Sequence, residues 1–507
     1  MPLLSIFLAA LIAHPVLGGA QGGTNIIQVP RSAPRDSATP DDNYVSYSIE
    51  PSSWPDFAGN LSAPNTFSYN LLKNIKQLTG EFPVMRLGGN TQDQIRFDAN
   101  AKVTLQGVMN PNISSDYPTN IIVGPSYYES YQTFPGVSYI HGFNLGNKTN
   151  WPATVASAPY VCKALRGNLD LFSIGNEPDL FWLAGQRDSS YTEAQYYTEW
   201  NDMYKALRAN MKCDQKTFAP SFAGVANFSL WRLDPLKAWN LLQPRVQDRS
   251  IKEFSQHNYM EAATSPGVTL QRTLMNHSNI VVIAEKLNRV FSKINGVPYV
   301  IGEHNSLARQ GKPGISNSFG AALWGVDFNL YMATQGVKRQ HMHQGTNYRY
   351  QSWQPVEGKN TKGTKAPYYG NIGVAAFLGG IKSLVNLPLD EMNAAYAGYD
   401  GKLKRVILIN LNQYNASDWN QDFVNNYPRP VKDFQLDLPC GGGIRRLIAN
   451  GSDAITGATF DGYSYNWELD NGKPVLLKNV TRGETFRRGI ARVSVPYSSV
   501  AILDLKC

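Results

Sequence analysis

The sequence predicts an α/β protein, a (β/α)8 TIM barrel with an appended C-terminal β-sandwich domain. Eight short apolar or β-branched runs recur at similar intervals, and helix-like stretches separate them. Polar and glycine residues gather at the C-terminal end of each run, where such barrels place their active sites. Beyond about residue 380, strand-like runs continue without long helix-like stretches.

The barrel is predicted over 44–380, because β-like and helix-like segments alternate throughout this part. Its helix-like segments include 191–212 and 316–335. The eight strand-like runs are 44–50, 84–90, 137–146, 170–178, 217–224, 253–260, 298–306 and 337–345.

The β-sandwich is predicted over 381–507, because turns rich in Gly, Asn and Asp separate its strand-like runs. The sequence leaves open whether segment 25–43 adds a strand to this domain. The clearest runs are 404–412, 434–439, 443–449 and 500–506.

The N-terminus favours secretion. Residues 3–13 are apolar and uncharged and small residues follow, so we expect a signal peptide over 1–20; a buried N-terminal helix is the alternative. No other stretch is apolar over the length that a membrane span requires. Eight glycosylation sequons support an extracellular glycoprotein: Asn60, Asn112, Asn147, Asn227, Asn276, Asn415, Asn450 and Asn479.

The cysteine count favours two disulfides. Four cysteines in an oxidising compartment allow three pairings. We favour Cys162–Cys213 and Cys440–Cys507, because each pair then stays within one predicted domain. The sequence contains no cysteine–histidine cluster that indicates a structural metal site.

The charge balance bears on the substrate. A net charge of +8 and a pI of about 9.0 would attract acidic glycans, although solubility explains them equally well. No lysine or arginine run indicates nucleic-acid binding.

Two glutamates stand at the ends of facing barrel strands. Glu177 ends the fourth run, before Pro178, and Glu303 ends the seventh, after Gly302. Both could therefore act on one substrate bond, as in retaining glycosidases, whose carboxylates lie about 5–5.5 Å apart. Either residue alone could be an ordinary salt-bridged strand end, but this is a poor explanation for both.

Four motifs resemble those of glycoside hydrolase family 79, the β-glucuronidase and heparanase family of clan A. They lie on four different predicted strands, and the resemblance extends into the β domain. The motifs are 86–93 (RLGGNTQD), 256–259 (QHNY), 301–306 (IGEHNS) and 341–348 (HMHQGTNY), together with the Asn-Glu-Pro of 176–178.

The resemblance implies a retaining double displacement without a cofactor. Glu177 would be the general acid/base and Glu303 the nucleophile, with Asn176 on the sugar 2-hydroxyl and Tyr259 donating to Glu303. The remaining implied substrate-binding residues are Glu50 and Asn90 on sugar hydroxyls, Asp93 in support of them, and His257.

The resemblance also implies a site for a uronic carboxylate. Tyr348 and the backbone N–H groups of Gly345 and Thr346 would bind it as neutral donors. We expect no buried cation beside the two glutamates, because a cation would lower both pKa values. While Glu303 is ionised, Glu177 should keep its proton to higher pH. Asn347 stands where related chains often have glycine, and Asn tolerates positive φ.

A metal site is the weaker interpretation of the histidines. His341 and His343 alternate on one predicted strand and so face the same side. A metal-dependent barrel hydrolase would need further ligands, for which His257 and His304 are available. Polar residues lining a sugar site explain the pattern better.

The predicted function is therefore a monomeric exo-β-glucuronidase that removes terminal β-D-glucuronosyl residues from glycans or glycosides. The sequence leaves 4-O-methylated residues open as substrates. An endo-β-glucuronidase of the heparanase type is disfavoured, because no dense basic clusters flank the strand ends and long loops (91–136, 346–367) could close one side. The sequence also leaves open a β-glycosidase for a neutral sugar and an inactive glycan-binding homologue.

Overall fold

The computed structural model describes residues 26–112, 114, 117–213, 216–225, 231–416, 425–477 and 482–507. The signal peptide expected over 1–20 and the sequons at Asn227 and Asn479 lie outside the described residues. Among the described residues, no helix is both long enough and apolar enough to cross a membrane.

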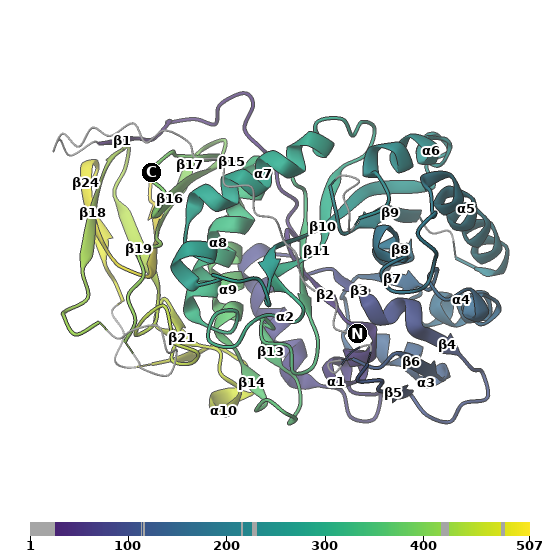
Figure 1. Cartoon of the computed structure of the whole chain (residues 1–507). Coiled ribbons are helices and arrows are strands. Elements are labelled where there is room, and N and C mark those ends of the chain that lie inside the picture. Colours follow the sequence, from purple (N-terminus) through teal and green to yellow (C-terminus); the bar gives the residue numbers. More distant parts are fainter. Residues whose placement is uncertain are drawn as a thin grey trace.

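A closed barrel of eight parallel strands forms the centre of the described chain (Figure 1). Each strand pairs with the next along the chain, and β12 pairs with β2 to close the ring. Each coincides with one predicted run, so the predicted fold class is confirmed. The strands are β2 (Val45–Ile49), β3 (Met85–Leu87), β7 (Tyr139–Phe143), β8 (Leu169–Ile174), β9 (Lys216–Phe222), β10 (Ile251–Ala262), β11 (Tyr299–Ala308) and β12 (Gln340–Gln344).

Helices surround the barrel, and local sequence explains where several begin. The Asn65 side chain caps α2, and Thr192 with Gln195 forms a capping box on α5. The longer helices are α2 (Thr66–Thr79), α4 (Trp151–Ala164), α5 (Glu193–Asn210), α6 (Pro235–Gln247), α7 (His277–Phe291), α8 (Phe319–Thr334) and α9 (Ala366–Leu378). The short turns are η1 (Pro51–Ser53), α1 (Trp54–Ala58), η2 (Asn90–Gln94), α3 (Pro125–Glu129), η3 (Ser130–Thr133), η4 (Lys148–Asn150), η5 (Pro178–Leu180), η6 (Leu270–Leu274) and α10 (Trp467–Asp470).

Two of these helices, α8 and α9, lie between the barrel and the C-terminal sheets. Every residue of α9 and nearly every residue of α8 is buried, because these helices are covered on both sides. At this interface, the His277 ring lies 2.9 Å from the Asp327 carboxylate, to which the Tyr396 hydroxyl of the β domain donates at 2.5 Å.

The C-terminal part forms two packed sheets, as a β-sandwich requires. The larger sheet has the order β15-β16-β17-β25-β19-β20-β21-β22, with β23 on β19, and the smaller has the order β1-β18-β24. In this smaller sheet β1, from the N-terminal segment, pairs in parallel with β18. The strands are β1 (Ile27–Gln28), β15 (Ser383–Asn386), β16 (Asn393–Asp400), β17 (Lys402–Asn410), β18 (Val431–Leu438), β19 (Gly442–Ile448), β20 (Thr459–Phe460), β21 (Tyr463–Ser464), β22 (Val475–Leu476), β23 (Thr485–Phe486), β24 (Gly489–Pro496) and β25 (Ser499–Leu505).

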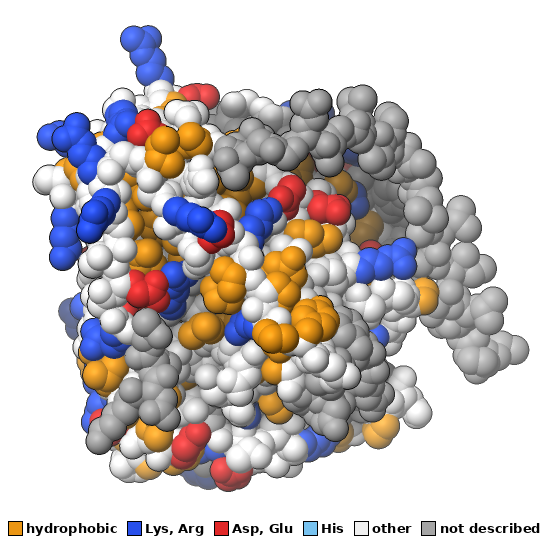
Figure 2. All heavy atoms as spheres, turned by 90° about the vertical axis from the view of Figure 1, so that its left-hand side faces the viewer, with side chains coloured by type: hydrophobic (Ala, Val, Ile, Leu, Met, Phe, Trp, Pro, Cys, Tyr) orange, Lys and Arg blue, Asp and Glu red, His pale blue; other side chains and the backbone are white. Residues whose placement is uncertain are grey.

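Alternation along the strands builds two cores. On β17, Ile407 and Ile409 join the core shared with the barrel helices, whereas Val406 and Leu408 join the core between the two sheets. Figure 2 looks onto the end of the molecule that carries β18 and β24. Its exposed face carries many Lys and Arg side chains, interspersed with acidic and apolar ones.

The long segments predicted as loops carry small sheets. Between β3 and β7, β4 (Ile95–Phe97), β6 (Asn120–Val123) and β5 (Leu105–Val108) form a three-stranded sheet. After β12, β13 (Trp353–Gln354) pairs with β14 (Gly363–Thr364). These strands are so short that no alternating hydrophobic pattern distinguishes them from loop in the sequence.

Both expected disulfides are present, Cys162–Cys213 and Cys440–Cys507. The sequon asparagines differ in exposure. Asn60, Asn112 and Asn450 are exposed, and Asn147 and Asn276 are half-buried. Asn415 contradicts the expectation, because it is wholly buried and its Oδ1 accepts from Ser452 Oγ at 2.7 Å.

Candidate active site

Glu177 lies just beyond the C-terminal end of β8, at the mouth of the barrel. Glu303 was expected at a strand end, but it lies in the middle of β11, which continues to Ala308. Glu177 adopts a left-handed backbone conformation, φ 51° and ψ 54°, immediately before the turn η5. Its N–H donates to the Ser221 carbonyl on β9 at 3.0 Å. Such a conformation at a non-glycine residue costs about 1–3 kcal/mol and persists where neighbouring structure enforces it, often at functional sites.

The side chains of these two glutamates converge. One carboxylate oxygen of Glu177, one of Glu303 and a ring nitrogen of His257 all lie within 4.8 Å of one another. Inverting glycosidases hold their carboxyl groups roughly 6.5–9.5 Å apart and retaining ones about 5–5.5 Å. The observed spacing is the shorter kind.

Three side chains hold Glu303. The Tyr259 hydroxyl donates to Oε1 at 2.8 Å, Arg86 Nη1 donates to Oε2 at 2.9 Å, and His343 Nδ1 lies 3.6 Å from Oε2. Burial alone would raise the pKa of Glu303, but the charges of His343 and Arg86 and the Tyr259 hydrogen bond outweigh it and lower this pKa to about 2.

The surroundings of Glu177 shift its pKa in the opposite direction. Burial, and then repulsion from the Glu303 carboxylate, raise the pKa of Glu177 to about 8. His257 Nδ1 lies 2.9 Å from Glu177 Oε1, and burial lowers the pKa of His257 to about 3, so this imidazole is neutral. At neutral pH the site therefore pairs a protonated carboxyl group with an ionised one. His257 was expected to bind substrate, but it contacts the acid group itself.

Arg86 was missed by the sequence analysis. Its side chain is fully buried and donates to Ser48 Oγ at 2.8 Å and Asn176 Oδ1 at 2.7 Å, besides Glu303. The expectation that no buried cation lies beside the glutamates is therefore wrong. One rigid guanidinium fork positions both the Glu303 carboxylate and the Asn176 amide.

Two glycines make room for this arrangement. A Cβ added at Gly88 would lie 2.5 Å from Arg86 Cζ. At Gly89, where φ is +142°, it would lie 2.7 Å from both carboxylate oxygens of Glu50. Backbone can approach the two charged groups so closely only without side chains. The adjacent glycines after Arg86 were the signal in the sequence that could have pointed to it.

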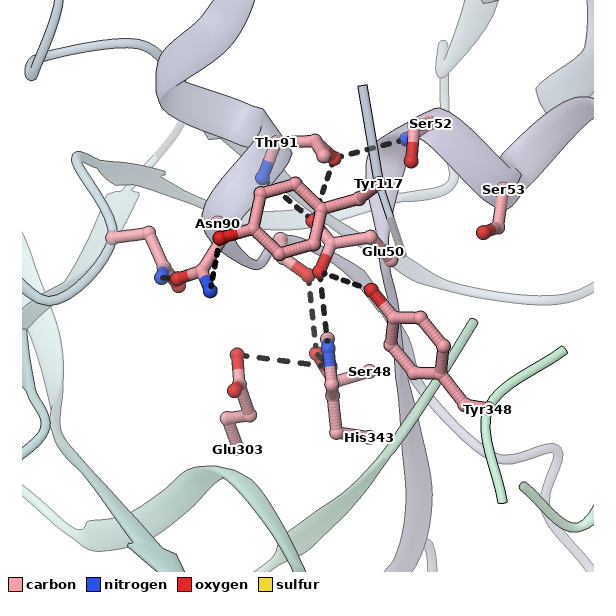
Figure 3. Close-up of polar contacts among 12 residues, drawn as sticks. Ser48, Glu50, Ser52, Ser53, Asn90, Thr91, Tyr117, Glu303, His343 and Tyr348 are labelled. Atoms are coloured by element: carbon pink, nitrogen blue, oxygen red, sulfur yellow. Dashed lines mark hydrogen bonds and ion pairs between the residues drawn. The ribbon is translucent and has the colours of Figure 1, made fainter. Parts of the chain in front are cut away.

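Glu50 lies at the other end of the site (Figure 3). Its Oε1 accepts from the Thr91 N–H at 2.7 Å and the Thr91 hydroxyl at 2.5 Å. Its Oε2 lies 3.3 Å from His343 Nε2 and accepts from the Tyr348 hydroxyl at 3.3 Å. The His343 ring thus lies between Glu50 and Glu303, and their charges raise its pKa against the effect of burial.

Asn90 and Asp93 take different places. Asn90 is exposed, and its Oδ1 accepts from Asn176 Nδ2 at 3.4 Å. Asp93 is buried behind the site, where its Oδ2 accepts from the Asn176 N–H at 2.8 Å and its Oδ1 from two further backbone N–H groups. Asp93 therefore supports the backbone of Asn176 and is almost fully buried.

The expected carboxylate-binding loop is only partly as predicted. The Thr346 N–H already donates to Ser53 Oγ at 3.0 Å, which argues against Thr346 as an anion donor. The Gly345 carbonyl accepts from the Tyr348 N–H at 3.0 Å. Asn347 has φ +68°, the conformation expected at this position. A cavity of about 210 Å³ adjoins the loop, lined by Thr346, Asn347, Tyr348, Arg349, Lys359 and Asn360.

The histidines weighed as metal ligands separate in space. His341 accepts from Arg339 Nε at 3.1 Å, and the His304 ring packs 5.2 Å from the Phe328 ring of α8. Among the described residues, the one group spaced to hold a metal ion is Glu177, His257 and Glu303. The Arg86 guanidinium already neutralises Glu303 there, so this group is a poor cation site.

Comparison with known proteins identifies the family. Residues 395–502 match the model of the glycosyl hydrolase family 79 C-terminal beta domain. The chain is 45% identical over 540 residues to a β-glucuronidase from Aspergillus niger, with 99% of each chain covered. The chain belongs to glycosyl hydrolase family 79. It is also 47% identical over 495 residues to a β-glucuronidase from Neurospora crassa, covering 87% of this chain and 88% of that one.

Solved structures extend this family relationship. A 4-O-α-L-rhamnosyl-β-D-glucuronidase from Fusarium oxysporum is 25% identical with a TM-score of 0.78, covering 95% of this chain and all of that one. A family 51 α-L-arabinofuranosidase from Bifidobacterium longum shares the fold alone, with 12% identity and a TM-score of 0.59 over 95% of this chain and 99% of that one. The family 79 chain is therefore a glycoside hydrolase.

Proposed function

We propose that the protein is a secreted, retaining exo-β-glucuronidase, which removes terminal β-D-glucuronosyl residues by double displacement. The observation that carries this proposal is the pair Glu177 and Glu303, with oxygens within 4.8 Å and pKa values shifted to about 8 and about 2. Two close carboxyl groups with opposite protonation states are what an acid/base and a nucleophile require.

In the first step, Glu303 Oε attacks the anomeric carbon while Glu177 gives its proton to the leaving glycosidic oxygen. The aglycone leaves as an alcohol, and the sugar is esterified to Glu303. This ester carries no charge, so the repulsion that helped to hold the proton on Glu177 is gone. Glu177 then accepts a proton from water, whose oxygen attacks the anomeric carbon and releases Glu303 as carboxylate.

Three side chains assist the two glutamates during the reaction. Arg86 and the Tyr259 hydroxyl hold Glu303 as an anion in line for attack. Arg86 also orients Asn176, which directly precedes the acid/base in the chain and would bind the sugar 2-hydroxyl. Hydrogen bonds to the 2-hydroxyl strengthen in the transition state of glycoside hydrolysis.

Preference for a uronic acid is supported by the loop after β12. The Tyr348 hydroxyl donates to Glu50, which lies at the opposite end of the site from Glu303. Arg349 and Lys359 line the adjoining cavity of about 210 Å³. The positive charge of these two residues would favour an anionic substrate. The relatives named β-glucuronidases agree with this preference.

Exo action is supported by the extra sheets beside the mouth of the barrel. The β4–β6–β5 sheet lies in the long segment 91–136, and the β13–β14 hairpin lies in the long segment 346–367. An endo enzyme would need an open cleft without such additions. Secretion is supported by the apolar N-terminal stretch, the exposed sequons and the two disulfides.

Hydrolysis of p-nitrophenyl β-D-glucuronide, compared with p-nitrophenyl β-D-glucoside at about pH 5, tests this proposal. We expect strong preference for the glucuronide. Preference for the glucoside would retain the two-glutamate mechanism and overturn the uronate assignment. Cleavage of neither would favour an endo enzyme or a glycan-binding protein. Glu303→Gln is the control, because it should abolish turnover in an enzyme and leave binding by a lectin intact.

A further inference from the structure

Asp179 is a buried carboxyl group that takes no part in the chemistry described above. It lies in η5, directly after Pro178, and its exposed fraction is 0%. Its Oδ1 accepts from the Ala223 N–H at 3.0 Å, and its Oδ2 accepts from the Gly224 N–H at 2.9 Å. Both oxygens of this side chain therefore hold the backbone that follows β9. Neither the strand pattern nor the family motifs pointed to this residue.

The same stretch of backbone, residues 221–224, also holds the acid/base glutamate. The Glu177 N–H donates to the Ser221 carbonyl at 3.0 Å. This bond and the two bonds to Asp179 lie on either side of Pro178, which has no N–H to donate. The left-handed conformation of Glu177, with φ 51°, is unfavourable for a glutamate, so surrounding contacts must enforce it. Segment 221–224 supplies these contacts.

Gln256, on β10, holds segment 221–224 from its other side. The Gln256 side chain is fully buried, and its Nε2 donates to the carbonyl groups of Phe222 and Gly224 at 2.7 and 2.6 Å. The next residue is His257, whose Nδ1 lies 2.9 Å from the carboxyl group of the acid/base. The contacts therefore form a closed ring, which leads from the backbone of the acid/base through segment 221–224 and back to its carboxyl group.

This ring bears on proton transfer, so a role for it in catalysis rests on the proposed function. A general acid must lie within about 2.6–3.2 Å of the atom that it protonates. If segment 221–224 moved, the backbone of Glu177 would be free to leave its left-handed conformation, and the carboxyl group would move with it. A displacement of about 1 Å at such a group can lower a rate by about 10²-fold.

We propose that Asp179 is a positioning residue for the acid/base. It clamps segment 221–224 and so keeps Glu177 in the left-handed conformation that directs its carboxyl group at the glycosidic oxygen. Gln256 has the same role from β10, because it holds the same segment. Neither residue contacts the nucleophile Glu303, so the proton transfer depends on them more than the nucleophilic attack does.

The test compares two leaving groups, in phenyl β-D-glucuronide and 2,4-dinitrophenyl β-D-glucuronide. Phenolate needs a proton to leave, whereas 2,4-dinitrophenolate leaves without one. Asparagine at position 179 has one acceptor oxygen in place of two, so Asp179→Asn loses one of the two backbone bonds. In this variant kcat/KM should fall about 10- to 100-fold for the phenyl compound and by less than about threefold for the dinitrophenyl compound.

A second variant and a control accompany this comparison. Gln256→Met keeps an unbranched side chain without the two donated bonds, and should change the ratio of the two kcat/KM values in the same direction. Asp327→Asn alters another fully buried aspartate, at the interface with the β domain. This control should lower stability and keep the wild-type ratio.

The outcomes separate this inference from the proposed function. Failure of wild type to cleave either glucuronide would overturn the proposed function itself. With an active wild type, equal losses for both substrates in Asp179→Asn would indicate a general effect on the fold and overturn the positioning role. The same ratio change in Asp327→Asn would overturn it too. If Asp179→Asn does not fold, an unchanged ratio in Gln256→Met is the contrary result.

Discussion

The Arg86 guanidinium donates to the Glu303 carboxylate at 2.9 Å, and the side chains are 0% and 7% exposed. A buried pair of this kind fixes which of two adjacent glutamates is ionised, because the cation contacts one of them directly. The same guanidinium holds Asn176, which directly precedes the second glutamate. Arg86 therefore joins the parts of the site that come from β3, β8 and β11.

The pH dependence of kcat/KM should reflect the two shifted glutamates. Glu177 acts as an acid only while protonated, so the rate should fall as pH rises through about 8. Glu303 attacks only while ionised, so the rate should fall as pH drops toward about 2. A profile measured with p-nitrophenyl β-D-glucuronide checks this. An alkaline limb already centred near about pH 5 would contradict it.

Replacement of Arg86 by glutamine should move the acidic limb of this profile to higher pH, because the Glu303 anion loses its buried partner. We also expect kcat to fall by about 10²-fold or more, as when other donors to catalytic anions are removed. An uncompensated buried carboxylate costs about 3–5 kcal/mol, so unfolding by urea should shift too. Arg492→Gln, in an exposed pair with Asp433, is the control. An acidic limb that stays in place would contradict this role.

Gly88→Ala should damage the site through Arg86. The added Cβ would lie 2.5 Å from the guanidinium carbon, so the side chain must move. Activity should fall together with stability. Gly325→Ala is a matched control, because a Cβ at that helical position would meet no atom within 4 Å apart from the backbone of its own helix. Alanine there should stabilise α8 by about 0.5–1 kcal/mol. Equal activity of Gly88→Ala and Gly325→Ala would show that the Arg86 side chain does not need the space at Gly88.

The contribution of the His277–Asp327 pair to stability should be largest at acidic pH. Burial lowers the pKa of His277, but Asp327 outweighs this and raises it overall. A raised folded-state pKa gives stability that is fully present below the unfolded value of about 6.5 and is lost as pH rises through the folded value. The Tm difference between wild type and His277→Gln should therefore be larger at about pH 5 than at about pH 9. The reverse order would be contrary to this account.

The sequence was sufficient to predict those features that follow from the order and position of the strands. The apolar runs located all eight barrel strands and placed Glu177 and Glu303 toward one face, because parallel strands in a barrel end at one face. Glu303 was expected at a strand end, but β11 continues beyond it to Ala308. The β domain was recognisable from its strand-like runs, although the short strands around it were not.

The other features of the site depend on contacts between residues that are distant in the sequence. Arg86 lies within β3, and the sequence does not show whose oxygens it meets across the barrel. His257 and Thr346 were expected to bind substrate, but each is engaged by a residue distant in sequence, Glu177 and Ser53.

The central claim is that Glu303 forms a covalent bond to glucuronic acid. Incubation with 2-deoxy-2-fluoro-β-D-glucuronosyl fluoride, followed by peptide mass spectrometry, tests it most directly. Fluoride leaves rapidly, and the 2-fluoro group slows hydrolysis of the ester, so the intermediate should accumulate. We predict one fluoroglucuronosyl group on the peptide that contains Glu303, and none in Glu303→Gln. A label on another residue, or no label in a protein that turns over p-nitrophenyl β-D-glucuronide, would contradict the account.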